Sequence, residues 1–178
     1  CRIVCVQNDI ADDFEKMLAG AMAELVVGPP TDQANDVGPV IDSAAHQKIV
    51  TYVEQMRSQN RLIGETPAVD GPGHFVAPVA FAVSSVDMVE EEVFGPVLHV
   101  VRFAGNNIKG LVAEINALGF GLTMGLHSRI DSRVNKIVEQ AKVGNIYVNR
   151  NQIGAVVGVQ PFGGEGLSGT GPKAGGPH

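Results

Sequence analysis

Apolar residues recur along this chain with two periods, one typical of buried strands and one typical of amphipathic helices. Short apolar runs bounded by turn-forming residues predict strands. Apolar residues spaced three and four apart predict helices, each opened by a polar side chain that can cap it. We expect strands at residues 2–7, 62–65, 75–83, 97–103, 122–128 and 145–149, and helices that begin near Asp9, Asp42 or Ser43, Asn106 or Asn107, and Asp131.

Each of these helices carries an apolar stripe, which predicts the face that it turns toward the core. The first helix is expected to be capped by Asp9 and to run to about residue 26. The expected core-facing residues are Phe14, Met17, Leu18, Met22 and Leu25 in the first helix and Val134, Ile137, Val138 and Ala141 in the last.

The alternation of strands and helices between residues 97 and 149 predicts βαβ units and a parallel sheet with covered faces, so the fold class is α/β. The glycine-rich residues after 149 show no helical periodicity, and we expect an irregular ordered loop there. That loop leaves the carboxyl end of a strand, which is where open α/β sheets bind their ligands.

Composition narrows the possible functions. The chain has 178 residues, 44% of them apolar and only 18% charged. A small compact domain fits these values, but so low a charge content favours a piece of a larger protein whose faces pack against other segments. The net charge of −6 and the absence of a basic run argue against nucleic-acid binding. We find neither a signal peptide nor an apolar stretch near the roughly 20 residues of a membrane span, and expect a cytosolic protein.

Cysteine and histidine give no sign of a reactive or metal-binding centre. Cys1 and Cys5 lie in one predicted strand, about 13 Å apart at the usual rise per residue, which is too far for a disulfide. Neither lies at a helix start or beside a fixed base, so both are expected to be inert. The five histidines are scattered, without metal-ligand spacing.

A candidate binding motif lies at residues 90–97, where three glutamates precede Val93, Phe94 and a Gly-Pro step. The Gly-Pro step redirects the backbone and can hold Glu92 and the Phe94 ring side by side at the lip of a cleft. A carboxylate accepts hydrogen bonds from paired hydroxyl groups, such as those of a ribose, and a ring offers a flat face to a heterocycle. The alternative is a plain helix end ahead of a strand.

A second candidate lies in the loop after residue 149. Gly154 and Ala155 have almost no side chain, so their backbone N–H groups can form a nest for an anion such as a substrate carboxylate. The alternative is that the glycine only satisfies turn geometry. Residues 164–169 formally fit the dinucleotide pattern G-x-G-x-x-G, but Pro161 before them and Pro172 after them do not suit a strand-to-helix turn, so we do not expect phosphate binding there.

Four motifs, taken in order, resemble those of the aldehyde dehydrogenase superfamily, and the resemblance covers essentially the whole chain. The family patterns are E-E-x-F-G-P, Y/F-G-L-T/S-x-G, G-x-x-x-V-N and P-F-G-G-x-x-x-S-G. In the same order, four segments of this chain match these patterns. They are Glu91–Pro96, the first six residues of Phe120–Leu126, Gly144–Asn149, and Pro161–Gly164 together with Ser168 and Gly169.

Residues 157–177 are similar to the proline utilization proteins, bacterial bifunctional enzymes of proline catabolism. The resemblance implies the C-terminal half of their L-glutamate γ-semialdehyde (pyrroline-5-carboxylate) dehydrogenase domain, with the parallel-sheet catalytic fold of the family. It also implies NAD as cofactor, with FAD confined to a separate proline dehydrogenase domain. The parent protein would be a cytoplasmic homo-oligomer, with peripheral attachment at the inner membrane left open.

The resemblance also implies a mechanism and a role for each matching residue. A cysteine thiolate adds to the aldehyde, hydride passes to NAD, and water hydrolyses the resulting thioester. Glu92 would bind the hydroxyls of the nicotinamide ribose, and Phe94 would pack near the nicotinamide. Gly154 and Ala155 would offer N–H groups to the substrate α-carboxylate, and Phe162 would wall the aldehyde pocket.

The nucleophile is expected outside this chain. In the family it precedes by four residues an arginine that matches Arg2, which places it three residues before Cys1. The NAD-binding Rossmann domain and a final association strand are also expected elsewhere, so we expect residues 1–178 alone to be inactive. The alternatives are another aldehyde dehydrogenase, such as one for succinate semialdehyde, and a non-catalytic structural domain of the same fold.

Overall fold

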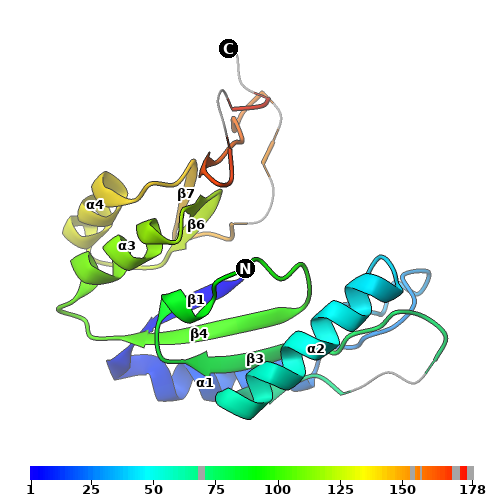
Figure 1. Cartoon of the computed structure of the whole chain (residues 1–178). Helices are drawn as coiled ribbons and strands as arrows, with labels where there is room; N and C mark the ends of the chain where they lie inside the picture. The colour runs from blue at the N-terminus through cyan, green and yellow to red at the C-terminus, as the bar shows by residue number, and fades with distance from the viewer. Residues whose placement is uncertain (68–70, 153–154, 157, 170–172, 176–178) are drawn as a thin grey trace. The chain divides into compact units, whose positions relative to one another are not determined.

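The computed structural model describes residues 1–67, 71–152, 155–156, 158–169 and 173–175. Its backbone divides into two compact units, Cys1–Gly105 (unit 1) and Asn106–His178 (unit 2), and each unit is described by itself (Figure 1).

Unit 1 is built on a four-stranded sheet with the strand order β1-β4-β3-β2. β1 and β3 pair parallel with β4, which lies between them, and β2 pairs antiparallel with β3. The elements in chain order are β1 (Ile3–Gln7), α1 (Asn8–Ala23), α2 (Ser43–Gln59), β2 (Arg61–Glu65), β3 (Val79–Val83), the short 3₁₀ helix η1 (Val86–Met88) and β4 (Val97–Phe103).

The two helices of unit 1 cover opposite faces of this sheet. Successive strand residues point to opposite faces of a sheet, so the side chains of His99 and Val100 of β4 lie on different faces. Val100 packs with Val6 of β1 and with Ala11 of α1 in a buried cluster, whereas the His99 ring lies against the Tyr52 hydroxyl of α2. Figure 1 shows α1 behind the sheet and α2 in front of it, which gives unit 1 three layers.

Unit 2 contains two pairs of short strands and two helices. β6 and β7 pair parallel, joined by α4 in a βαβ unit, and β5 pairs antiparallel with β8. The elements are α3 (Ile108–Ala117), β5 (Phe120–Gly121), β6 (Thr123–Leu126), α4 (Asp131–Gln140), β7 (Asn145–Val148) and β8 (Glu165–Gly166).

Much of the predicted α/β pattern is confirmed. β1 and β4 match the expected strands, and the Asp42 side chain caps α2 by accepting a hydrogen bond from the backbone N–H of Ala45 at 2.8 Å. The βαβ unit between β6 and β7 is also present. Outside β8, the described residues after Asn149 contain no further helix or strand, as expected for the final segment.

Several local predictions were wrong. Asp9 does not cap α1, because the helix begins one residue earlier and Asp9 lies in its first turn, where its side chain accepts from Gln7. Met17 is 75% exposed, because the buried face of α1 runs through Ala11, Glu15 and Met22. Val138 of α4 is also exposed.

The strand pattern also differs in detail. Residues 75–78 precede β3 without joining it, and the predicted strand 122–128 is shortened to β6, with β5 lying just before it. Within unit 1, β4 pairs with β1 and β3, which both lie outside the 97–149 alternation.

Candidate functional site

The turn that carries Glu92 and Phe94 is anchored by buried valines. Val86, Val89 and Val93 have almost no exposed surface, and they hold the irregular segment between η1 and β4 against the sheet. The Gly95 N–H donates to the Val93 carbonyl at 2.9 Å, and the Val97 N–H donates to the Gly95 carbonyl at 2.8 Å. Two tight three-residue turns therefore redirect the backbone here, as the Gly-Pro step predicts.

Gly95 lets the centre of this turn lie close to α2. A Cβ at Gly95 would lie 2.6 Å from the Cδ1 atom of Ile49, which is buried on α2. A side chain at this position would therefore force the Ile49 side chain to move.

Because Val93 points inward, the residues on either side of it point outward. Glu92 is exposed and the Phe94 side chain is 83% exposed. The neighbouring Glu91 forms an exposed ion pair with Lys48 at 3.0 Å, whereas Glu92 forms no hydrogen bond or ion pair within the part of unit 1 that the structure describes. An unengaged carboxylate beside an exposed ring suits hydroxyl groups and a flat heterocycle, so these residues fit the ribose and nicotinamide of NAD.

In unit 2, Asn149 fixes the direction in which the chain leaves β7. It has a left-handed backbone with φ of 54°, which is uncommon for a residue other than glycine. Its side-chain amide pairs with both main-chain groups of Ser128: Oδ1 accepts from the Ser128 N–H and Nδ2 donates to the Ser128 carbonyl, each at 2.9 Å. The segment that follows β7 thus starts from a constrained backbone.

The predicted substrate residues are placed in part. Ala155 is half-buried, whereas Gly154 lies outside the described residues. Phe162 is half-buried and exchanges two main-chain hydrogen bonds with Ala174, each at 2.8 Å. The structure therefore shows a fixed backbone at Phe162.

The segment that formally fits G-x-G-x-x-G takes part in a two-stranded pairing. Glu165 and Gly166 form β8 against β5, and the Leu167 N–H donates to the Gly119 carbonyl at 2.8 Å. No helix follows among described residues 167–169 and 173–175. This context differs from the strand-to-helix turn of a dinucleotide fingerprint.

Sequence reasoning missed Asn145 at the start of β7. Its side chain donates to the Pro161 carbonyl at 2.9 Å and accepts from the Gly163 N–H at 3.2 Å. The available signal was the G-x-x-x-V-N segment, in which a second asparagine directly follows the glycine. Glu92 and Phe94 belong to unit 1 and Ala155 and Phe162 to unit 2, so each pair is described within its own unit.

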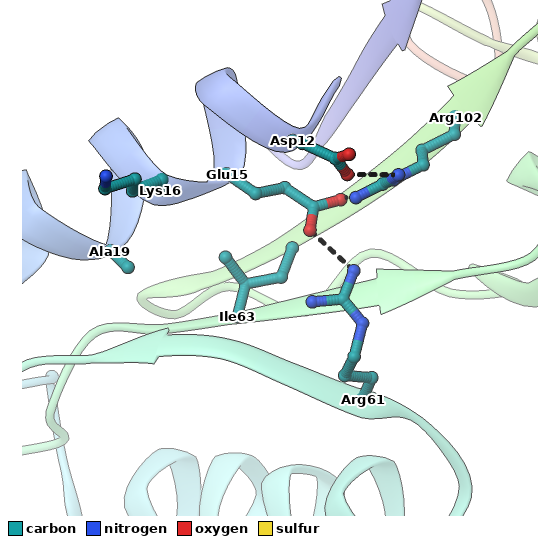
Figure 2. Close-up of a pocket in the computed structure, with 7 residues that line it drawn as sticks. All are labelled: Asp12, Glu15, Lys16, Ala19, Arg61, Ile63 and Arg102. Carbon is teal, nitrogen blue, oxygen red and sulfur yellow. Dashed lines mark hydrogen bonds and ion pairs between the residues drawn. The ribbon is translucent and has the colours of Figure 1, made fainter. Parts of the chain in front are cut away.

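A charged pocket of about 530 Å³ lies in unit 1 between α1 and the sheet, and sequence reasoning missed it as well (Figure 2). Glu15 stands at its centre, between two arginines from different strands. None of the predicted site residues lines the pocket, whose lining residues are Asp12, Glu15, Lys16, Ala19, Arg61, Ile63 and Arg102.

Glu15 is almost fully buried, yet both of its carboxylate oxygens are paired. Oε1 accepts from Arg102 Nε at 2.7 Å and Oε2 accepts from Arg61 at 2.5 Å. The Arg102 guanidinium, with help from that of Arg61, holds the pKa of Glu15 below its ordinary value of 4.5, while burial acts in the opposite direction. Arg102 also binds Asp12 at 2.8 Å, so the pocket is a largely self-neutralised ion cluster that ties α1 to β2 and β4.

Among the described residues of unit 1, His99 is the other titratable group that is buried. Its Nδ1 lies 3.0 Å from the Arg2 carbonyl and its Nε2 lies 2.8 Å from the Tyr52 hydroxyl. Burial lowers the pKa of His99, which favours the neutral form of the ring. Among the described residues, no three His, Cys, Asp or Glu side chains gather as metal ligands would. No helix in the described part of the chain is both long enough and apolar enough to cross a bilayer.

Comparison with known proteins identifies the family. The model of the aldehyde dehydrogenase family matches residues 1–178. The chain is 50% identical to bifunctional protein PutA of Escherichia coli over 183 aligned residues, which cover 99% of the chain and 14% of that protein. It is 36% identical to 1-pyrroline-5-carboxylate dehydrogenase of a Geobacillus species, covering 99% of the chain and 34% of the relative.

Solved structures give the same result. A crystal structure of a PutA variant from Bradyrhizobium japonicum superimposes with a TM-score of 0.95 at 52% identity, covering 99% of this chain and 18% of that one. The structure of 1-pyrroline-5-carboxylate dehydrogenase from Thermus with bound NAD superimposes with a TM-score of 0.88 at 32% identity, covering 98% of this chain and 34% of that one. The present chain thus spans a minor part of each relative. Its fold, motifs and relatives agree that it belongs to the aldehyde dehydrogenase family.

Proposed function

We propose that this chain is the C-terminal part of the catalytic domain of an NAD-dependent L-glutamate γ-semialdehyde dehydrogenase, within a bifunctional proline-catabolic protein. The observation that carries the proposal is the 49–50% identity to enterobacterial PutA proteins over 99% of the chain. Identity to 1-pyrroline-5-carboxylate dehydrogenases is lower, at 36% for the Geobacillus protein, which favours the bifunctional type.

The residues of unit 1 would hold the cofactor. Glu92 would accept hydrogen bonds from the nicotinamide-ribose hydroxyls, and Phe94 would lie against the nicotinamide. The exposure of both side chains, and the absence of a partner for Glu92 among the described residues, support these roles. When bound, NAD supplies the hydride acceptor for the reaction.

The residues of unit 2 would hold the substrate. The N–H groups of Gly154 and Ala155 would bind the α-carboxylate, and Phe162 would form a wall of the aldehyde pocket. The nucleophilic cysteine would lie three residues before Cys1, where its thiolate adds to the aldehyde carbon and later leaves as water hydrolyses the thioester. FAD would belong to a separate proline dehydrogenase domain of the same protein, which we propose is a homo-oligomer.

The test is substrate preference in the full-length protein. We expect NAD reduction to be faster, as kcat/KM, with L-glutamate γ-semialdehyde than with succinate semialdehyde or propanal. If the full-length protein preferred succinate semialdehyde, it would be a different aldehyde dehydrogenase. If it oxidised none of these aldehydes, the domain would be non-catalytic.

A variant tests the carboxylate anchor separately. Ala155→Pro removes one N–H of the proposed nest. It should raise KM for glutamate semialdehyde at least tenfold and change KM for propanal by less than twofold. Equal changes for the two aldehydes would contradict the anchor.

A further inference from the structure

The side chain of Asn145 bridges the backbone on either side of Phe162. Its Nδ2 donates to the carbonyl of Pro161 at 2.9 Å, and its Oδ1 accepts from the N–H of Gly163 at 3.2 Å. Asn145 is the first residue of β7 and is half-buried. A single amide group thus binds the residue before Phe162 and the residue after it.

Three other contacts hold the same short segment. The main-chain N–H and carbonyl of Phe162 both pair with Ala174. A Cβ added at Gly144 would overlap the carbonyl oxygen of Gly163, so these two backbones touch. The Lys173 ammonium group donates to the Gly144 carbonyl. Phe162 therefore extends from a main chain that is fixed on one side by Ala174 and on the other by the start of β7.

The uncharged carboxamide of Asn145 satisfies both of its partners. The Pro161 carbonyl requires a donor and the Gly163 N–H requires an acceptor, and a carboxamide presents one of each. An ionised aspartate has the same shape but only acceptors, so it would keep the Gly163 bond and place a charged oxygen against the Pro161 carbonyl.

We propose that Asn145 is a specificity-determining positioning residue, which fixes Phe162 and thereby sets the width of the aldehyde pocket. This inference rests on the proposed function, in which Phe162 walls that pocket. Asn145 does not itself touch the substrate in this account. It acts through the main chain of residues 161–163.

Unit 2 provides a matched control in Asn116 of α3. The Asn116 side chain donates to the Gln140 carbonyl at 2.8 Å and accepts from the Lys142 N–H at 2.9 Å. This amide bridges one residue in the same way, but its partners are the last residue of α4 and a residue in the connection from α4 to β7. Asn116→Ala therefore removes an equivalent pair of hydrogen bonds without releasing the segment around Phe162.

The experiment compares Asn145→Ala, Asn145→Asp and Asn116→Ala in the full-length protein. The first readout is hydrogen exchange at the Gly163 amide, which does not depend on activity. We expect exchange at least tenfold faster in Asn145→Ala and unchanged in Asn116→Ala. Unchanged exchange in Asn145→Ala would overturn the bridging role.

The second readout is the ratio of kcat/KM for glutamate semialdehyde to kcat/KM for propanal. We expect Asn145→Ala to lower it at least tenfold, mainly through KM for the semialdehyde, with KM for NAD unchanged. Asn145→Asp should be impaired as much as Asn145→Ala at pH 7. If Asn145→Asp kept the wild-type ratio of the two kcat/KM values, the hydrogen bond that Asn145 Nδ2 donates to the Pro161 carbonyl would not be needed for selectivity. An equal loss in Asn116→Ala would reduce Asn145 to a structural role.

Failure of the proposed function would look different. A wild-type protein that does not oxidise glutamate semialdehyde would refute that function, and the specificity role of Asn145 with it. A wild-type protein that is active and an Asn145→Ala variant with unchanged selectivity would refute only the present inference.

Discussion

Units 1 and 2 differ in what holds their chains in place. Of the 20 apolar residues that are buried in the described chain, 17 lie in unit 1 and only Leu111, Val112 and Tyr147 lie in unit 2. Unit 1 is thus stabilised mainly by apolar burial on both faces of its sheet. Unit 2 relies more on hydrogen bonds from side-chain amides to the main chain, as at Asn116, Asn145 and Asn149.

The glycines show the same difference. In unit 1, a Cβ at Gly28, Gly95 or Gly105 would meet only side-chain atoms. In unit 2, a Cβ at Gly144 or Gly169 would meet main-chain atoms of Gly163 or Gly164. Side chains can move aside more easily than a backbone can, so Gly144 and Gly169 tolerate less change than Gly28, Gly95 and Gly105. A segment with little apolar core can therefore still be positioned accurately, provided that backbone contacts and amide hydrogen bonds replace the core.

The largest expected effect tests the core of unit 1. Phe81 of β3 has no exposed surface, and Phe81→Ala should lower the free energy of opening of unit 1 by about 3–5 kcal/mol, from lost burial and a residual cavity. Hydrogen exchange of the β3 and β4 amides measures this directly. Phe81→Leu, which keeps most of the volume, should cost less than about 1.5 kcal/mol. A cost below about 1 kcal/mol for Phe81→Ala would contradict a core-dominated unit 1.

The next effect tests backbone contact in unit 2. Gly144→Ala forces the main chain at Gly163 away from β7, and we expect it to lower the opening free energy of the β7 amides by about 3 kcal/mol, at the upper end of overpacking costs. Gly20→Ala is the matched control. Gly20 lies within α1 with open space around it, so alanine should stabilise unit 1 by about 0.5–1 kcal/mol. If both substitutions changed the opening free energy in the same direction, the contrast between backbone contact at Gly144 and open space at Gly20 would be contradicted.

The local sequence pattern predicted β1, β4 and the Asp42 cap of α2 in unit 1. Each of these features depends on residues that are close together in the sequence. The buried face of α1 was predicted only in part, because Glu15 is buried by Arg61 and Arg102, which are 46 and 87 residues away. A local pattern assigns a glutamate to the surface, since it carries no information about two distant cations.

The candidate site shows the same limit. The Gly-Pro step predicted a redirected backbone at Glu92 and Phe94, and the exposure of both side chains agrees with that prediction. Asn145 was missed because its partners are main-chain atoms of Pro161 and Gly163, and main-chain partners leave no side-chain signature in a sequence.

The smallest expected effect concerns the ion cluster, which is the polar exception in unit 1. At pH 7, Glu15→Gln should lower the opening free energy of β2 and β4 by about 1–2 kcal/mol, because the charge-assisted hydrogen bonds to Arg61 and Arg102 are weakened. Asp12→Asn is the control. Its side chain is 89% exposed, so its ion pair with Arg102 should contribute less than about 0.5 kcal/mol.

The effect of Glu15 on stability must depend on pH. The pKa of Glu15 is lower in the folded protein than its ordinary value of 4.5, so between these two values the unfolded chain binds more protons. The contribution of Glu15 is therefore complete above pH 4.5 and is lost as the pH falls through the folded-state pKa. The difference between wild type and Glu15→Gln, measured by hydrogen exchange corrected for the intrinsic rate at each pH, should narrow below pH 4.5. If the difference stayed constant down to pH 3, the stabilisation by Glu15 would not come from its charge.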